Sequence, residues 1–457
     1  MTTNVTRLRE IVGEDWVITR REQMESYLVD ETALAVRPEP AKNVVLVKPA
    51  SAAEIAGILK LANGEQTPVF IRGGGTGICG GAVPTADGIL LSTERLDKIE
   101  EVDRDNLMVV VESGVPFGAM LKAVEDAGLF FPPHPGAENA HVGGLVALNA
   151  GGVRAIKYGV IRNFVKGLEV VVPTGEILTL GGKLLKNNQG LDLLHLMINS
   201  GGILGVITKV IFRLCPRFSH SGTLIVSYDN RHDAIDSVPK ILQSGVIPLA
   251  IEFIERDVVE MSATHLGMKW PATKGQAYLL VILTGDSEDE VYAQGEKVSG
   301  ICEQNGCTDI LIAERREEQA AILKIRSEVY PSLKKNVADV LDITVPPASI
   351  GIMMDRVDEI ARRYDTTIPT YGHAGDGNLH PHVMNDLAER GLLREVKREI
   401  YQEAIRLGGV ITGEHGLGTV RLPDLDLYPD GKTWELMRGI KNVFDPNHIL
   451  NPGIGLY

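Results

Sequence analysis

The stretch Phe70–Gly81, FIRGGGTGICGG, decides the fold, because six of its twelve residues are glycine. Gly75, Gly77 and Gly80 match the G-x-G-x-x-G spacing of a dinucleotide-binding turn. The preceding segment, TPVFIR, is typical of a buried strand, so the glycines begin where a strand ends. A glycine-rich loop at such a place lets bare backbone approach a ligand, and phosphate is the group that such loops commonly hold.

The segment after the glycines decides against two common phosphate-binding folds. A Rossmann turn opens a helix whose N-terminus holds the pyrophosphate, but here Pro84, Asp87 and Gly88 lead into a second apolar strand, ILLS. A P-loop needs Lys-Ser or Lys-Thr after the glycines, and neither follows. The sequence therefore predicts a strand, a loop and a strand, with successive N–H groups forming a concave site for a diphosphate. The alternative is a loop that packs tightly for steric reasons alone.

Three further glycine-dense stretches follow in the same half of the chain, at 132–144, 149–159 and 199–208. One such loop is an ordinary turn, but four of them within about 140 residues indicate an extended ligand that runs along several backbones. The segments between them are rich in β-branched residues and predict strands, and Pro216 ends this block.

The next part of the chain has the β-α-β-β-α-β order of a ferredoxin-like plait. Its strand-like segments lie at 223–229, 250–255, 277–285 and 308–313, and its helical patterns lie at 233–244 and 287–305. We therefore expect an α+β protein with three parts. These are a first domain at 1–216, a second of roughly 190 residues at 217–407, and a C-terminal segment at 408–457.

Composition excludes several classes of partner. The chain has 457 residues, 44% of them hydrophobic, and a net charge of −14. Nucleic acids and anionic membrane surfaces are bound through clustered Lys and Arg, so both are poor partners. No apolar run is long enough to span a bilayer, which predicts a cytoplasmic protein without a transmembrane segment. The four cysteines include no C-x-x-C pair, so their spacing builds neither an iron–sulfur cluster nor a zinc site.

A metal site is predicted near the C-terminal end, in the stretch IPTYGHAGDGNLHPHV. Asp376 and Gly377 form a strong two-residue hairpin signal, which would place His373 opposite His380 on one face of the sheet. Two imidazoles about 5 Å apart can chelate one metal ion. The alternative is a pair of hydrogen-bonded histidines in a half-buried sheet.

The stretch ITGEHGLG supplies a third candidate ligand, Glu414, and a neighbour, His415, that points to the other side of an extended backbone. A His, His, carboxylate set leaves coordination positions open and suits zinc, iron(II) or manganese(II). Such an ion would bind a hydroxyl group and a neighbouring carboxylate and lower the pKa of the hydroxyl. A neutral His415 could then accept the hydroxyl proton. The alternative is a polar turn whose side chains satisfy their own backbone.

These residues together resemble the D-2-hydroxyacid dehydrogenase branch of the FAD-binding vanillyl-alcohol oxidase and p-cresol methylhydroxylase superfamily. The resemblance covers nearly the whole chain and lies in the segments 72–77, 135–136, 142–144, 149–152, 201–206, 372–380, 413–418 and 451–453. It implies a two-part FAD-binding domain, an antiparallel-sheet cap, and a C-terminal segment that returns to the flavin and completes the active site.

The resemblance also implies roles for individual residues. The expected metal ligands are His373, His380 and Glu414, the expected base is His415, and Arg326 is expected to bind the substrate carboxylate. The expected FAD-contacting residues are Arg72, Gly73, Gly74, Gly75, Thr76, Gly77, Pro135, Gly136, Val142, Gly143, Gly144, Asn149, Gly151, Gly152, Tyr158, Gly202, Gly205, Val206, Ile207 and Asn451.

The implied activity is oxidation of a short D-2-hydroxy acid, D-lactate first, with FAD and one divalent metal. The stretch DVLDITVPP lacks the lysine that the hydroxyglutarate enzymes carry there, which favours lactate or glycolate over D-2-hydroxyglutarate. Because the chain carries no cluster cysteines, we expect a separate electron acceptor, such as an electron-transferring flavoprotein or an iron–sulfur subunit. A His-His-Glu metallohydrolase with a nucleotide-binding domain, and a non-catalytic flavoprotein scaffold, stay open as alternatives.

Overall fold

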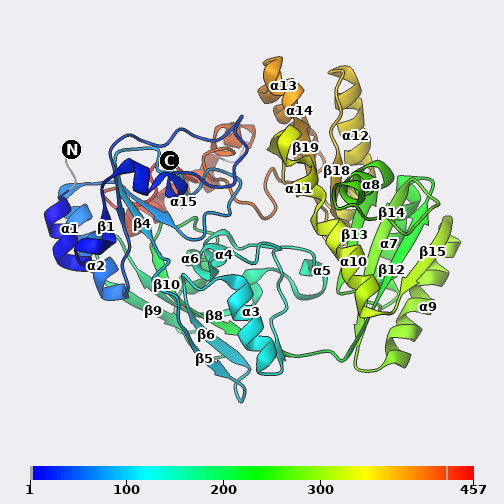
Figure 1. The fold of residues 1–457 in the computed structure, drawn as a ribbon, viewed down its shortest axis with the longest axis horizontal. Helices are drawn as coiled ribbons and strands as arrows, with labels where there is room; N and C mark the ends of the chain where they lie inside the picture. Colours follow the sequence, from blue (N-terminus) through cyan, green and yellow to red (C-terminus); the bar gives the residue numbers. More distant parts are fainter. Residues whose placement is uncertain (1–3, 429–430, 457) are drawn as a thin grey trace.

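The structure is a computed structural model that describes residues 4–428 and 431–456. Helices and sheets are mixed along the chain, which confirms the α+β class. Figure 1 shows two bodies side by side. The segments from blue to the blue-green strands β8, β9 and β10, together with the red α15 and both chain ends, form the first body, and the segments from β12 to α14, in green, yellow and orange, form the second.

A small sheet in the first body positions the loop at Phe70–Gly81. Its strands lie in the order β1-β2-β4-β3, with β2 and β3 both parallel to β4. The chain passes from β3 to β4 through the glycine-rich loop without a helix, so the predicted strand, loop and strand are confirmed. The elements are α1 (Val5–Val12), β1 (Val17–Ile18), β2 (Val44–Val47), α2 (Ala52–Glu65), β3 (Val69–Arg72) and β4 (Gly88–Ser92).

A second, antiparallel sheet of the order β5-β6-β10-β8-β9 carries the other glycine-dense stretches. One of them holds a helix that the sequence did not predict, α4, which begins at Val142. Glycine is needed in its first turn, because a Cβ on Gly143 would lie 2.6 Å from the Cβ of Ser113. The elements are β5 (Ile99–Asp103), β6 (Met108–Glu112), α3 (Phe117–Asp126), β7 (Leu129–Phe130), α4 (Val142–Leu148), α5 (Ala155–Tyr158), β8 (Val165–Val171), β9 (Ile177–Gly181), α6 (Leu193–Met197), β10 (Val206–Arg213) and β11 (Cys215–Pro216).

The second body contains the predicted plait. Four antiparallel strands in the order β15-β12-β14-β13 confirm the ferredoxin-like arrangement, and α8 is an additional helix between β13 and β14. The elements are β12 (His220–Tyr228), α7 (Arg231–Gln243), β13 (Ala250–Glu255), α8 (Arg256–His265), β14 (Ala277–Gly285), α9 (Glu288–Gln304) and β15 (Cys307–Ala313).

The same sheet continues past β13 into the segment with the candidate metal ligands, in the order β13-β18-β19-β16. Strands β13 and β14 in the middle of the sheet are buried on both faces, so they are almost continuously apolar. The charged Glu252 in β13 is an exception, and a buried carboxylate is costly unless a cation or hydrogen-bond donor pairs with it. The elements are α10 (Arg316–Ser327), α11 (Val329–Leu333), β16 (Val337–Val340), β17 (Ile343–Thr344), α12 (Ile350–Arg363), β18 (Thr370–His373), β19 (Asn378–Met384), α13 (Asn385–Glu389), α14 (Leu393–Arg406) and α15 (Gly431–Phe444).

The chain end returns to the first body, as expected. The side chain of Asn451 accepts a hydrogen bond from the backbone N–H of Ile71 at 2.9 Å, and the backbone N–H of Asn451 donates to the carbonyl of Val69 at 2.8 Å. These bonds attach the C-terminal segment to β3, directly before the glycine-rich loop.

A buried ion cluster joins β16 to α14 and to the segment after the candidate base. Asp339 accepts from Arg421 at 3.0 Å and pairs with Lys397, and all three side chains are buried. Burial raises the pKa of Asp339, but the two cations lower it more, so the pKa lies below its ordinary value. The charge of Asp339 therefore contributes its full stabilisation to the fold above about pH 4. That stabilisation is lost as the pH falls through the lowered pKa.

Replacing Asp339 with asparagine is expected to cost about 3–5 kcal/mol of unfolding free energy, because it leaves two buried cations without a charge partner. Urea unfolding at pH 7 measures this cost. The matched control is Asp426→Asn, since Asp426 pairs with Arg398 at 2.8 Å but is 62% exposed. The control should change stability by about 1 kcal/mol or less, and equal effects of the two changes would contradict the prediction.

Candidate active site

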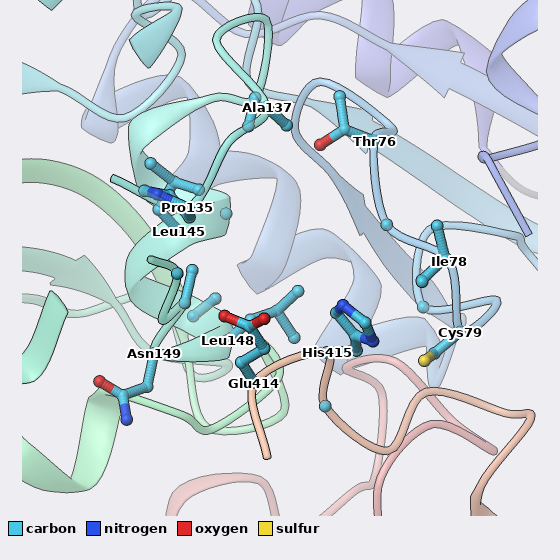
Figure 2. A pocket seen from close by; sticks show the side chains of 18 of the residues that line it. Thr76, Ile78, Cys79, Pro135, Ala137, Leu145, Leu148, Asn149, Glu414 and His415 are labelled. Carbon is cyan, nitrogen blue, oxygen red and sulfur yellow. The ribbon is translucent and has the colours of Figure 1, made fainter. Parts of the chain in front are cut away.

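A cavity of about 1520 Å³ is lined by residues of both bodies. Typical sites for small molecules measure about 300–1,000 Å³, so this one has room for a dinucleotide and a small substrate together. In Figure 2, Glu414 and His415 lie near each other, with Leu148 and Asn149 on one side and Ile78 and Cys79 on the other.

The glycine-rich loop presents free backbone donors to this cavity. Among the hydrogen bonds of the described residues, none has an N–H group of residues 73–77 as its donor. The side chain of Arg72 lies under the loop and donates to the carbonyls of Ser26 and Val29 at 3.0 and 2.7 Å. A Cβ on Gly75, whose φ is +68°, would collide with that guanidinium. Unpaired N–H groups in a concave loop fit the diphosphate of FAD.

Most of the residues expected to contact FAD line the cavity, and five do not. Those on its wall are Gly73, Gly74, Gly75, Thr76, Gly77, Pro135, Gly136, Gly143, Gly144, Asn149, Gly152, Gly202, Gly205, Ile207 and Asn451. Arg72, Val142, Gly151, Tyr158 and Val206 are not on it. The Tyr158 ring packs against Phe130 and Phe164. Gly151 lies beside Glu414, where a Cβ would come within 2.6 Å of Oε2.

The two candidate histidine ligands come from one hairpin, but its predicted register is wrong. A two-residue turn at Asp376 and Gly377 would place His373 opposite His380. In the structure the turn contains four residues, 374–377, and His373 lies opposite Asn378.

The length of this turn is set by the close approach of Gly377 to a distant segment of the chain. The N–H of Gly377 bonds to the carbonyl of His373 at 3.1 Å, and a Cβ on Gly377, whose φ is +86°, would collide with the carbonyl of Val345. The register differs from the prediction by two residues, and a shift of two keeps side chains on the same face. His373 and His380 therefore still share a face, with ring centroids 5.3 Å apart.

Glu414 completes a three-residue set with these histidines. Its Oε1 lies 3.4 Å from Nε2 of His373 and 3.5 Å from Nε2 of His380. A tetrahedral ion with bonds of about 2.1 Å separates its ligands by about 3.4 Å. Both histidine–carboxylate distances therefore fit a shared divalent metal ion, and the site is buried apart from its opening to the cavity.

A second grouping, Asp342 with His380, Glu414 and His415, has donor atoms within 4.8 Å of one another and leaves out His373. We favour the set with His373, because Asp342 is already occupied. Its Oδ2 accepts from the backbone N–H groups of Gly413, Glu414 and His415 at 2.7–2.9 Å. Burial raises the pKa of Asp342, but His415 and these donors lower it more, below its ordinary value. Asp342 thus holds the loop that carries the ligand and the base.

Glu252 supports both the metal set and the expected substrate arginine. Its Oε1 lies 2.6 Å from Nδ1 of His373, and its Oε2 pairs with Arg326. Only 1% of Glu252 is exposed. Burial lowers the pKa of His373, but Glu252 raises it more, well above its ordinary value. A carboxylate on the second nitrogen of a ligating histidine fixes the ring and makes it a stronger ligand.

His415 and Arg326 both face the cavity, as a base and a carboxylate-binding residue must. The His415 ring stacks on His380 with centroids 5.2 Å apart, and its side chain is 24% exposed. Arg326 lies over the ring of Tyr371 at 4.4 Å, and its Nε has no hydrogen-bond partner.

Replacing Glu252 with glutamine is expected to weaken divalent metal binding about 10–100-fold, because an amide oxygen cannot accept from His373 and Arg326 with a full charge. Equilibrium dialysis with Zn²⁺ or Mn²⁺ measures this. Glu255→Gln is the matched control, since Glu255 lies on the same strand and pairs with Arg231 at 2.8 Å. An E252Q protein that folds and binds metal as tightly as the E255Q protein would refute the prediction.

Sequence reasoning missed Glu252 and Asp342. The signal for Glu252 was an acidic residue inside the apolar stretch AIEFIE. Asp342 is likewise a single acidic residue among the mainly apolar residues of VLDITV. Burying a carboxylate is costly unless it is paired, so such residues point to a partner.

Comparisons with known proteins identify the family. A FAD binding domain matches residues 44–181, and the C-terminal domain of FAD linked oxidases matches residues 218–454. The D-lactate dehydrogenase of Archaeoglobus fulgidus is 43% identical over 434 residues, which cover 94% of this chain and 95% of that protein. The glycolate oxidase subunit GlcD of Bacillus subtilis is 36% identical over 414 residues, covering 89% of this chain and 88% of that protein.

Solved structures share the fold. The 4-ethylphenol oxidase of Gulosibacter chungangensis matches with a TM-score of 0.80 at 17% identity, over 99% of this chain and 96% of that one. A p-cresol methylhydroxylase matches with a TM-score of 0.79 at 17% identity and the same coverage. These matches confirm the p-cresol methylhydroxylase type of fold. The two domain matches and the full-length relatives decide against the metallohydrolase and show that the chain belongs to the FAD-linked oxidases, in the family of D-lactate, glycolate and 2-hydroxyglutarate dehydrogenases.

Proposed function

We propose that the protein is a FAD- and metal-dependent dehydrogenase that oxidises a short D-2-hydroxy acid, D-lactate first, to the 2-oxo acid. The observation that carries the proposal is the spacing of His373, His380 and Glu414, at 3.4 and 3.5 Å, on the wall of the cavity that the glycine-rich loop also lines. The relative from Archaeoglobus fulgidus, which is named a D-lactate dehydrogenase, supports the choice of substrate.

The residues divide the chemistry between them. His373, His380 and Glu414 would hold the metal, and the backbone of residues 73–77 would hold the FAD diphosphate. When bound, FAD supplies a two-electron acceptor and the metal a Lewis acid that lowers the pKa of the substrate hydroxyl.

The imidazole of His415 accepts the hydroxyl proton in this proposal. The backbone N–H of His415 donates to the buried Asp342 at 2.7 Å, which fixes the position of the residue. The imidazole ring itself lines the cavity. Arg326 donates to the substrate carboxylate through N–H groups that Glu252 does not occupy. The buried surroundings keep water away and strengthen these interactions.

The cavity wall supports a small substrate. In the stretch DVLDITVPP, Val340 lines the cavity with an apolar side chain where a second carboxylate would need a cation. D-lactate is therefore our first choice. Glycolate and D-2-hydroxyglutarate are the alternatives, since relatives carry those names too.

We further propose that a separate protein, an electron-transferring flavoprotein or an iron–sulfur subunit, accepts the electrons. The spacing of the cysteines supports a separate acceptor. No helix in the described ranges, 4–428 and 431–456, has the length and apolar character needed to cross a bilayer. The cytoplasmic location expected from the sequence stays a prediction.

An anaerobic panel of hydroxy acids tests the proposal. Purified protein that holds FAD should lose its yellow colour with D-lactate and not with L-lactate, and EDTA treatment should stop this until a divalent metal is restored. Bleaching by D-2-hydroxyglutarate alone would reject the monocarboxylate, and bleaching that EDTA leaves intact would reject the metal.

A further inference from the structure

Arg154 is a cation on the cavity wall that has no acidic partner among the residues that the structure describes. It precedes α5, and its Nη1 makes a long hydrogen bond of 3.4 Å to the carbonyl of Pro132. The guanidinium lies 5.0 Å from the centre of the Phe130 ring. Its other four N–H groups donate to no described residue, and no carboxylate of a described residue lies within 4.0 Å of it.

The other cations on the wall differ from Arg154. Arg326 is paired with Glu252, and Lys324 is exposed to solvent. Partial burial on the cavity wall lowers the pKa of Arg154 to about 10. Arg154 is half-buried, so its charge bears part of the cost of removal from water without a partner charge to offset it, and its place on the wall suits an anion that arrives with a ligand.

The surroundings of Arg154 belong to the part of the cavity expected to hold the flavin. The chain from Gly151 to Arg154 starts beside Glu414 and passes His134, since a Cβ on Gly152 would collide with the carbonyl of that histidine. Burial and Arg154 lower the pKa of His134 to about 4, so this histidine is neutral at pH 7 and adds no second positive charge. Pro135, Gly136 and Gly152 line the same wall.

We propose that Arg154 balances the negative charge that the flavin takes up on reduction and so raises the reduction potential of the bound FAD. A fixed cation in a low-dielectric cavity stabilises the more negative redox state of a cofactor. In the proposed function, the metal ligands and Arg326 bind the substrate. Arg154 is not used there, and we therefore assign it to the cofactor. The inference rests on the proposed function only through the bound FAD.

The test equilibrates the FAD-loaded protein with a reference dye of known potential, without substrate and without added metal. Arg154→Met should shift the ratio of reduced to oxidised flavin toward the oxidised form at least tenfold, which equals about 30 mV for a two-electron couple. Arg154→Lys keeps the charge and should stay close to the parent protein. Lys157→Met is the matched control, because Lys157 lies on α5 three residues after Arg154, donates to Thr284 at 3.0 Å and does not line the cavity.

Three results would overturn the proposed redox role of Arg154. An R154M ratio within twofold of the parent protein would overturn the proposal. Unchanged dye equilibrium with at least tenfold weaker oxalate binding would assign Arg154 to the substrate carboxylate instead. Arg154→Gln serves as the second variant if R154M does not fold. Loss of FAD from both, with circular dichroism unchanged, would assign the residue to the cofactor phosphates and equally overturn the redox role. Because the dye assay needs no hydroxy acid, it still applies if D-lactate is not oxidised.

Discussion

Replacing His380 with asparagine is expected to remove the metal and to lower kcat/KM for D-lactate on the order of 10³-fold. The variant loses the donor that lies 3.5 Å from Oε1 of Glu414, and a Lewis acid acting on the hydroxyl is worth several kcal/mol of barrier. Metal analysis of the purified variant and steady-state kinetics measure the two effects separately.

The matched control for this change is His382→Asn. His382 is also buried, lies two residues further along β19, and stacks on Tyr371 with centroids 5.1 Å apart, but it is not part of the three-donor set. The control should keep the metal and most of the activity. An H380N protein that retains one equivalent of metal would remove His380 from the ligand set.

Replacing His415 with asparagine is expected to lower kcat by about 10²–10⁴-fold while metal and FAD stay bound, because the variant lacks a general base. Asp342 holds this position through the backbone N–H at 2.7 Å, so the loop should keep its shape when the side chain changes. Kinetics with D-lactate, together with FAD absorbance and metal content, separate loss of the base from loss of the site.

A product analogue makes the His415 test sharper. Oxalate should bind H415N within about threefold of its affinity for the parent enzyme, since the groups that bind the carboxylates are unchanged. If H415N turned over within threefold of the parent enzyme, another group would have to accept the proton. The non-catalytic scaffold, which predicts no change in turnover, would then gain support.

Local sequence patterns determined much of the fold. The strand before Gly73, the apolar strand after Gly88 and the β-α-β-β-α-β order of the second body all follow from short-range periodicity and turn residues. The extension of the plait sheet by β18, β19 and β16 did not follow, because strand pairing over more than a hundred residues leaves no local pattern.

For the candidate site, the sequence alone determined which residue types could ligate and donate, and the motifs near 373–380 and 414–415 placed them close together along the chain. Only the tertiary structure decided how these residues meet. The contact of Gly377 with Val345 selects a four-residue turn. Pairing of β13 with β18 puts Glu252 behind His373, and Asp342 gathers the loop at 413–415. These contacts join residues far apart in the chain, and their energies depend on burial, which a sequence pattern does not encode.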